Sequence, residues 1–181
     1  MSLVSPSDSP LPAPRTAPTP PRRVETTVEL EIELIRHLAR SRRQGDQMAL
    51  LWIEVELLSL VGQASADGLR ETVAQALGAR LLYRVRRTDF VFQVGDTGFA
   101  VLLDTDKAGA ELVERRLFEQ LRGPYGLEKN LAQVQISVGL AVSSEAHRHG
   151  SGLLQCAIDD IYARPQPAAA ALPASSVANS I

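Results

Sequence analysis

Apolar residues recur along the middle of the chain with two different periods, and these periods predict a succession of helices and strands. Spacings of three and four residues, typical of helices, occur in residues 24–43, 66–82, 106–121 and 152–164. Runs and alternations typical of strands occur in residues 49–56, 90–94, 99–103 and 132–142. The order helix, then β-α-β-β-α-β-α, predicts an α/β (α+β) fold with a central mixed, mostly antiparallel sheet flanked by helices.

One apolar stripe on each helix is expected to face the sheet. The expected inward residues are Val28, Ile32, Ile35, Leu38 and Ala39 on the first helix, Leu69, Val73, Ala76, Leu77 and Leu81 on the second, and Leu112, Val113, Leu117 and Leu121 on the third. Asp106 precedes the third stripe, and we expect its side chain to cap that helix.

The two ends differ in composition from this middle part. Residues 1–23 contain seven prolines among Ser, Thr and Ala, and residues 165–181 are similarly rich in Pro, Ala and Ser. Such segments bury too little apolar surface to offset the entropy lost on ordering. We therefore expect disordered segments at residues 1–23 and 165–181, an N-terminal helix at residues 24–44 and a folded domain at residues 45–164.

Composition limits the classes of function. The 181 residues are 45% hydrophobic and carry a formal net charge of −2, which suits one domain with tails and gives no general attraction to nucleic acids or membranes. No apolar run approaches the ~20 residues of a membrane span, and no signal-peptide pattern is seen at the N-terminus. The single cysteine, Cys156, is typical of a reducing compartment. We expect a cytoplasmic protein that neither binds nucleic acid nor inserts into a membrane.

The most specific local pattern is a β-hairpin at residues 90–103. Residues 95–98, with the sequence Gly-Asp-Thr-Gly, separate two β-favouring runs, and glycine accepts the positive φ that a tight turn requires. We expect these four residues at an exposed tip and Phe99, which follows them, in the core. Arg86 and Asp89 precede the hairpin with the spacing Arg-x-x-Asp.

Residues 45–164 resemble the GGDEF family of diguanylate cyclase domains. Four segments carry the resemblance, in the family's order: LLWIEVE at 50–56, the hairpin with its Arg-x-x-Asp at 86–103, ISVGLAV at 136–142 and LLQCAIDDIYAR at 153–164. The resemblance implies a palm-like nucleotidyl cyclase fold, with the family's Gly-Gly-(Asp/Glu)-Glu-Phe motif at residues 95–99.

The catalytic residues of that motif are changed in this chain. In the family, one carboxylate on the first strand and one in the turn hold Mg²⁺ while two GTP molecules join into cyclic di-GMP. Glu54 occupies the strand position, but Thr97 occupies the turn position and Gly98 replaces the Glu that follows. After Gly95, Asp96 replaces the motif's second glycine and brings a negative charge to the place of a phosphate. The resemblance thus implies a degenerate domain without cyclase activity.

Two further observations bear on this interpretation. The family's base-reading Lys, Asn and Gly-His are absent from residues 57–67. Glu54 and Glu56 fall on one strand face, and we interpret them as a remnant or a solvated edge rather than a metal site, because the opposing ligand is missing. We expect no bound metal, Mg²⁺ included, and no cofactor. A residual GTP-binding or cyclase role through Glu54 is the weakest of the alternatives.

The Arg-x-x-Asp pair corresponds to a second site of the family, the inhibitory site, where cyclic di-GMP binds. A guanidinium can bind phosphate or a guanine edge through two parallel hydrogen bonds, which suits Arg86 to this role, and the Asp89 carboxylate can accept from guanine N–H groups. The resemblance adds an arginine on the following helix, which aligns with Arg116, or with Arg115 if the register slips. The alternative interpretation is a surface salt bridge between Arg86 and Asp89 that contributes little.

The resemblance as a whole implies a catalytically inactive domain that binds cyclic di-GMP and passes the signal to a protein partner, in bacterial control of biofilm, exopolysaccharide or motility. The alternative is a nucleotide-independent scaffold that uses the helix at residues 24–43 and the palm-like domain for docking or for formation of a homodimer. Loss or retention of ligand binding when the inhibitory-site arginine is removed distinguishes the two.

Overall fold

The computed structural model describes residues 20–61, 66–127, 130–143 and 150–164. Strands and helices alternate along them in an order close to the predicted one. The elements are β1 (Arg22–Val24), α1 (Thr27–Gln44), β2 (Met48–Val61), α2 (Ala66–Leu82), β3 (Phe90–Val94), β4 (Gly98–Asp104), α3 (Lys107–Leu121), β5 (Gly123–Leu127), β6 (Asn130–Val142) and α4 (Gly150–Ala163).

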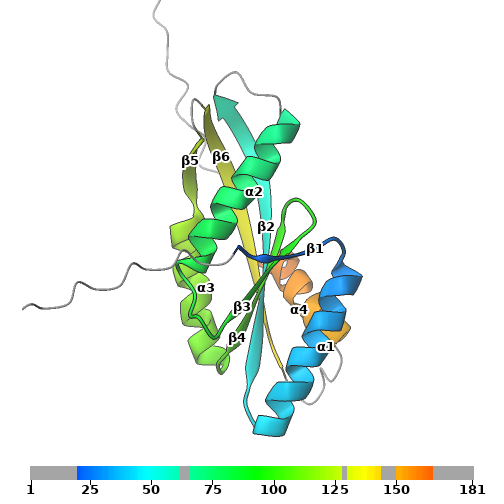
Figure 1. Ribbon diagram of the computed structural model, residues 1–181. Coiled ribbons are helices and arrows are strands. Elements are labelled where there is room, and N and C mark those ends of the chain that lie inside the picture. Colours follow the sequence, from blue (N-terminus) through cyan, green and yellow to red (C-terminus); the bar gives the residue numbers. More distant parts are fainter. Residues whose placement is uncertain (1–19, 62–65, 128–129, 144–149, 165–181) are drawn as a thin grey trace, which may run out of the picture.

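The strands form one six-stranded sheet in the order β1-β3-β4-β2-β6-β5. Only β1 and β3 run parallel, and the other neighbours are antiparallel, which confirms the expected mixed, mostly antiparallel sheet. The long central pair β2 and β6 crosses the whole molecule (Figure 1). Strand β2 extends to Val61, beyond the predicted end at residue 56, through an irregularity between Leu57 and Ser59.

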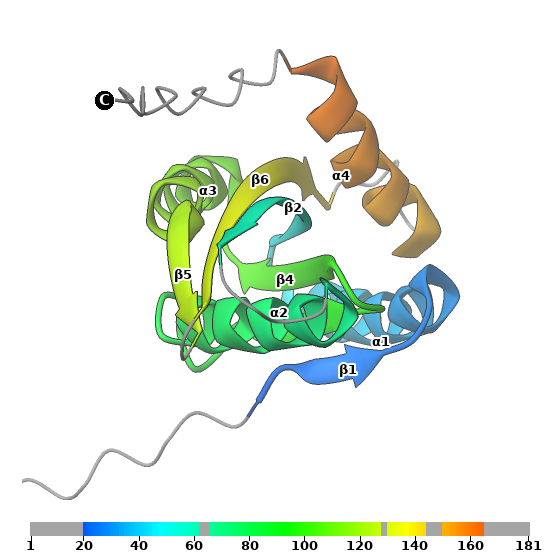
Figure 2. The same ribbon diagram turned by 90° about the horizontal axis from the view of Figure 1, so that it is seen from above.

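Two helices cover each face of the sheet, so the molecule has three layers (Figure 2). On one face, α2 and α3 enclose a core that includes Leu77, Phe99 and Leu117. On the other face, α1 and α4 enclose a second core that includes Leu34 and Phe92. Strand β4 contributes to both cores because successive side chains of a strand point to opposite faces.

The covered stripe of α1 differs from the predicted one. Val28, Ile32 and Ile35 are 63%, 47% and 50% exposed, and Ala39 is exposed as well; of the predicted set only Leu38 is buried. The covered face instead comprises Leu30, Glu33, Leu34, Leu38 and Ser41. The prediction was wrong because this helix carries two apolar stripes on different faces, and periodicity does not tell which one the sheet covers.

The other predicted stripes are closer to the structure. On α2 the predicted leucines and Val73 are buried and Ala76 is partly buried. On α3 the Asp106 side chain caps the helix by accepting from the Gly109 amide at 2.8 Å, as predicted. Leu112, however, is 61% exposed, because the covered face of α3 runs through Glu114, whose carboxylate pairs with Arg164, the residue after α4.

Two short strands were not predicted. Strand β1 lies in a stretch expected to be outside the fold, and its pairing with β3 corrects that boundary: residues 22–24 belong to the sheet, and α1 begins at Thr27 rather than at residue 24. Strand β5 contains Gly123, Pro124 and Gly126, which are poor strand formers, and it pairs at the sheet edge with β6. The expected disordered segments at residues 1–19 and 165–181 lie outside the described residues.

Candidate functional site

The turn between β3 and β4 is the first of two places where predicted site residues gather. Gly95 adopts a left-handed conformation with φ 56°, and its amide donates to the carbonyl oxygen of Val24 at 2.9 Å. Val94 pairs with Gly98, so the loop comprises residues 95–97 and Gly98 already belongs to β4. The expected four-residue tip is therefore one residue too long. Phe99 is fully buried, which confirms its predicted place in the core.

The charge at the tip is engaged by the N-terminal strand. Asp96 accepts a hydrogen bond from Arg23 Nη2 at 3.1 Å and forms an ion pair with it, and both side chains are well exposed. Thr97, also exposed, accepts from the Val55 amide through its backbone carbonyl oxygen at 3.1 Å. The turn is thus held between β1 and β2. The side chain of Thr97 ends in a neutral hydroxyl, which lines the space beside the turn.

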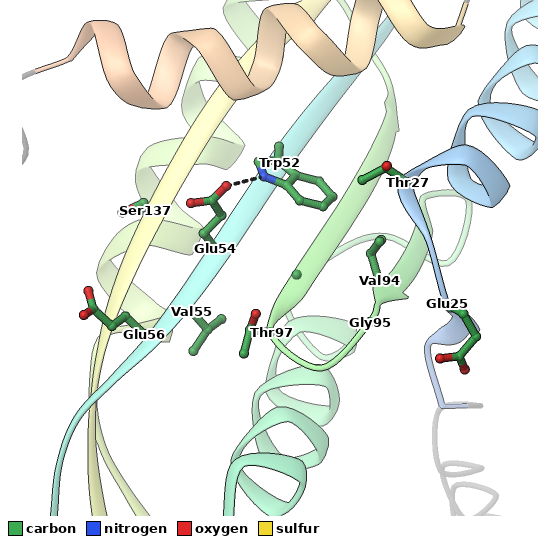
Figure 3. A pocket seen from close by; sticks show the side chains of 11 residues that line it. Glu25, Thr27, Trp52, Glu54, Val55, Glu56, Val94, Gly95, Thr97 and Ser137 are labelled. Carbon is green, nitrogen blue, oxygen red and sulfur yellow. Dashed lines mark hydrogen bonds between the residues drawn. The ribbon is translucent and has the colours of Figure 1, made fainter. Parts of the chain in front are cut away.

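A cleft of 470 Å³ opens beside this turn, between the start of α1 and the central strand β2 (Figure 3). Three of its lining side chains are carboxylates, and none of the described lining residues is basic. The lining residues are Glu25, Thr27, Trp52, Glu54, Val55, Glu56, Val94, Gly95, Thr97, Gly98 and Ser137. We call this space the hairpin cleft. Its negative lining repels a triphosphate rather than attracting one.

Trp52 lines the hairpin cleft and binds the carboxylate of Glu54, two residues further along β2. Its indole Nε1 donates to Glu54 Oε1 at 2.9 Å (Figure 3). A Cβ atom added to Gly98 would lie 3.0 Å from Trp52 Cη2 and 3.0 Å from the Val94 carbonyl oxygen. A side chain at position 98, where the family motif has its Glu, would therefore crowd the indole and the backbone.

The loop between α2 and β3 holds the second group of predicted site residues. We call residues 83–89 the Arg86 loop. The Asp89 carboxylate accepts from the Arg86 backbone amide at 2.7 Å, and the Asp89 amide donates to the Arg86 carbonyl oxygen at 3.1 Å. Asp89 thus closes the loop through the backbone of Arg86. The exposed Arg86 side chain makes no salt bridge within the described part of the chain.

Helix α3 brings an arginine to the same loop. Arg116 Nη2 donates to the carbonyl oxygen of Arg84 at 2.8 Å, which joins two residues 32 positions apart in the chain. Arg115 is exposed on the same helix. Of the two arginines that the sequence left open, Arg116 is therefore the one that the structure places against the Arg86 loop.

The carboxyl group of Asp89 has an altered acidity. Partial burial raises its pKa above the ordinary value of 3.8, while the hydrogen bond from the Arg86 amide and the nearby Arg86 charge act in the opposite direction. Asp104, at the end of β4, acts in both directions: a backbone hydrogen bond from it lowers the pKa of Asp89, and its negative charge raises that pKa.

Comparisons with known protein families agree with this architecture. The family model described as "Diguanylate cyclase, GGDEF domain" matches residues 26–166 of the chain. The chain therefore belongs to the GGDEF family, as the motifs of the hairpin and of the strands around it indicated. The search of curated proteins found no match.

Solved structures show the same fold at low sequence identity. The GGDEF domain of YfiN (also called TpbB) from Pseudomonas aeruginosa is 20% identical, with a TM-score of 0.61 over 77% of this chain and 89% of that one. DgcB from Caulobacter crescentus, crystallised in complex with c-di-GMP, is 13% identical, with a TM-score of 0.60 over 77% and 75%. SiaD from Pseudomonas aeruginosa, in complex with its activator SiaC, is 18% identical, with a TM-score of 0.60 over 75% and 53%.

Two absences complete the description. Among the described residues no three His, Cys, Asp or Glu side chains are placed to hold a metal ion together. In the part of the chain that the structure describes, no helix has the length and apolarity that a membrane crossing requires.

Trp52 is only 6% exposed, and sequence reasoning missed the hydrogen bond of its indole to Glu54. The signal was available, since residues two apart on a strand point to the same face. No sequence signal predicted that Glu25 lines the hairpin cleft. Its position depends on strand β1, which has no apolar pattern that would predict a strand.

Proposed function

We propose that this chain is a GGDEF domain that binds cyclic di-GMP without making it. The observation that carries the proposal is the Arg86 loop, where Asp89 fixes the backbone, the Arg86 residue is exposed, and Arg116 of α3 lies against the same loop. The salt-bridge alternative finds no support in this geometry, because Asp89 binds the amide of Arg86 instead of its guanidinium.

The chemistry of the loop suits a guanine dinucleotide. The Arg86 guanidinium can donate two parallel hydrogen bonds to a phosphate or to the acceptor edge of guanine. Asp89 can accept from the N–H groups of a guanine, and Arg116 supplies a second positive charge beside the loop, with Arg115 exposed on the same helix. These are the contacts that anionic, donor-rich cyclic di-GMP requires.

The hairpin cleft supports the absence of catalysis. Phosphoryl transfer depends on positioning and on neutralisation of charge, which the family achieves with Mg²⁺. The residues present do not fit that ion, because Thr97 offers a neutral hydroxyl and Glu54 is held by the indole of Trp52. Asp96 adds negative charge at the turn, where its carboxylate already pairs with Arg23. We derive no reaction step at this site.

Two of the structural relatives extend the proposal. The DgcB structure contains c-di-GMP and the SiaD structure contains a protein activator, which are the two kinds of partner proposed for this chain. The protein partner, a cytoplasmic location and a role in biofilm, exopolysaccharide or motility control belong to this proposal as well. A scaffold that functions without any nucleotide is the competing function.

Calorimetric titration with cyclic di-GMP tests the binding. We expect a dissociation constant in the low micromolar range, about −8 kcal/mol. Arg86→Ala should weaken binding at least ~30-fold, because a bound phosphate would lose its paired donor, and Arg86→Lys should not restore it. Arg87→Ala is the matched control, since it removes the same charge from the next position of the loop and should change affinity far less.

The outcomes separate the competing functions. No heat at tens of micromolar ligand would favour the nucleotide-independent scaffold. Tight binding that survives both Arg86→Ala and Asp89→Ala would place the ligand elsewhere on the protein. The catalytic half of the proposal is tested separately with GTP and either Mg²⁺ or Mn²⁺: cyclic di-GMP formed in proportion to protein and abolished by Glu54→Ala would contradict it.

A further inference from the structure

Helix α1 presents an apolar stripe to solvent on the side away from the sheet. Val28, Ile32, Ile35 and Ala39 are all exposed, with the three larger side chains between 47% and 63%. Their spacing of four, three and four residues places them in one row, the spacing of residues that pair helices side by side. We call these four residues the outer stripe. Within the described residues, no element covers it.

The helix itself is firmly attached, so the outer stripe is a fixed surface. Its inner face is completely covered: Leu30 and Leu34 are 0% exposed and Leu38 is 2% exposed. Thr26 caps its first turn by accepting from the Glu29 amide at 3.2 Å, and Gly45 ends it in a left-handed conformation with φ 75°. Figures 1 and 2 show α1 at the margin of the molecule, with its outer side open.

The charges beside the outer stripe are segregated along the helix. The first half carries Glu29 and Glu31, with Glu25 just before the helix, and the second half carries the arginines 36, 40, 42 and 43. Arg36 binds Glu33 of its own helix at 2.9 Å, yet its side chain is still 67% exposed and can reach a neighbour. A surface that is acidic at one end and basic at the other is complementary to itself when reversed.

We propose that the outer stripe is the contact surface for a second copy of this chain, with the two α1 helices antiparallel. An axis midway between residues 33 and 34 sets Ile32 against Ile35 of the partner subunit and Val28 against the partner's Ala39. The same axis brings Glu29 near the partner's Arg36, because both residues flank the outer stripe on the same side. A two-fold interface requires such self-complementarity, and a parallel pairing would instead set acidic ends against each other.

The contact is small, so the dimer is weak. Four apolar side chains from each copy bury less area than a standard interface, and we expect dissociation constants on the order of tens of micromolar. High salt should weaken the contact, because exposed opposite charges are screened. The inference is independent of the proposed binding at Arg86, and its test needs no ligand.

Sedimentation velocity of the full chain over about a hundred-fold concentration range tests the dimer. The wild type should shift from monomer to dimer, and Ile32→Gln with Ile35→Gln should stay monomeric. Leu112→Gln is the matched control, since this leucine is 61% exposed on α3 and its variant should dimerise like the wild type. A wild type that is monomeric at every concentration, or a dimer unchanged by the double substitution, would overturn the proposal.

Disulfide trapping tests the direction. In a Cys156→Ser background, a mixture of Val28→Cys and Ala39→Cys chains should form the mixed disulfide-linked dimer. Val28→Cys alone should not, because the two copies of position 28 lie at opposite ends of the contact. Efficient trapping of Val28→Cys with itself would indicate parallel helices and contradict the proposed arrangement.

Discussion

Gly98 and Trp52 depend on each other at the scale of single residues. A Cβ atom at position 98 would press against the indole of Trp52, and the same indole donates a hydrogen bond to Glu54. One aromatic ring therefore contacts both position 98 and Glu54. An acidic side chain placed at position 98 would therefore need Trp52 to shift.

This dependence predicts a stability effect. Gly98→Ala should lower the free energy of unfolding by about 1–3 kcal/mol, because the new methyl group would press on Trp52 and on the Val94 carbonyl oxygen. Urea denaturation measures it. Combined with Trp52→Leu, the same substitution should cost less than it does alone, which makes the two effects non-additive. Additive effects would show that the two residues are not in contact.

Asp89 gives the binding a predictable pH dependence. Its carboxyl must be ionised to accept from guanine, and burial raises its pKa above 3.8 in the free protein. Affinity should therefore decline as the pH falls through that raised pKa, and it should be constant at higher pH. Asp89→Asn should bind more weakly at neutral pH and lose this dependence. Titrations over a pH series check both, and an equal slope in the two proteins would contradict the role of Asp89.

At the scale of elements, β4 ties the hairpin to the core. Phe99 is the first residue of β4 with a side chain in the core, and it is completely buried against α2 and the sheet. Phe99→Ala should cost about 3–5 kcal/mol of stability, measured by chemical denaturation. Leu112→Ala, at an exposed apolar position, is the comparison and should change little. A small loss at Phe99 would mean that the hairpin is not anchored in this way.

The elements also show where sequence patterns suffice. Helix α2 and the hairpin were predicted closely because each carries a single, unambiguous signal: one apolar stripe in α2 and a glycine-flanked turn in the hairpin. Helix α1 has two stripes, and only contacts with the sheet and α4 select Leu30 and Leu34 over Ile32 and Ile35. Glu114 is buried and forms an ion pair with Arg164, a contact 50 residues away in the chain that no local pattern reveals.

At the scale of the whole molecule, the two candidate sites lie at opposite ends of strand β3. The hairpin cleft lies where the turn meets the central strand β2, and the Arg86 loop lies at the other end of β3, next to α3. The motifs of the sequence named the residues of the turn and of the Arg86 loop as candidates. Their surroundings were not predictable, since Arg23 and Glu25 reach the turn only through strand β1, and Arg116 reaches the loop only through the packing of α3.

This separation makes one measurement decisive. Backbone amide shifts in an NMR titration with cyclic di-GMP report both sites at once in the full chain. The receptor account predicts that the largest changes fall on residues 84–89 and on Arg115 and Arg116, with little change at Glu54 or residues 95–98. Shifts concentrated at Glu54 and the turn, or no shifts at saturating ligand, would contradict the claim that this domain senses cyclic di-GMP through Arg86.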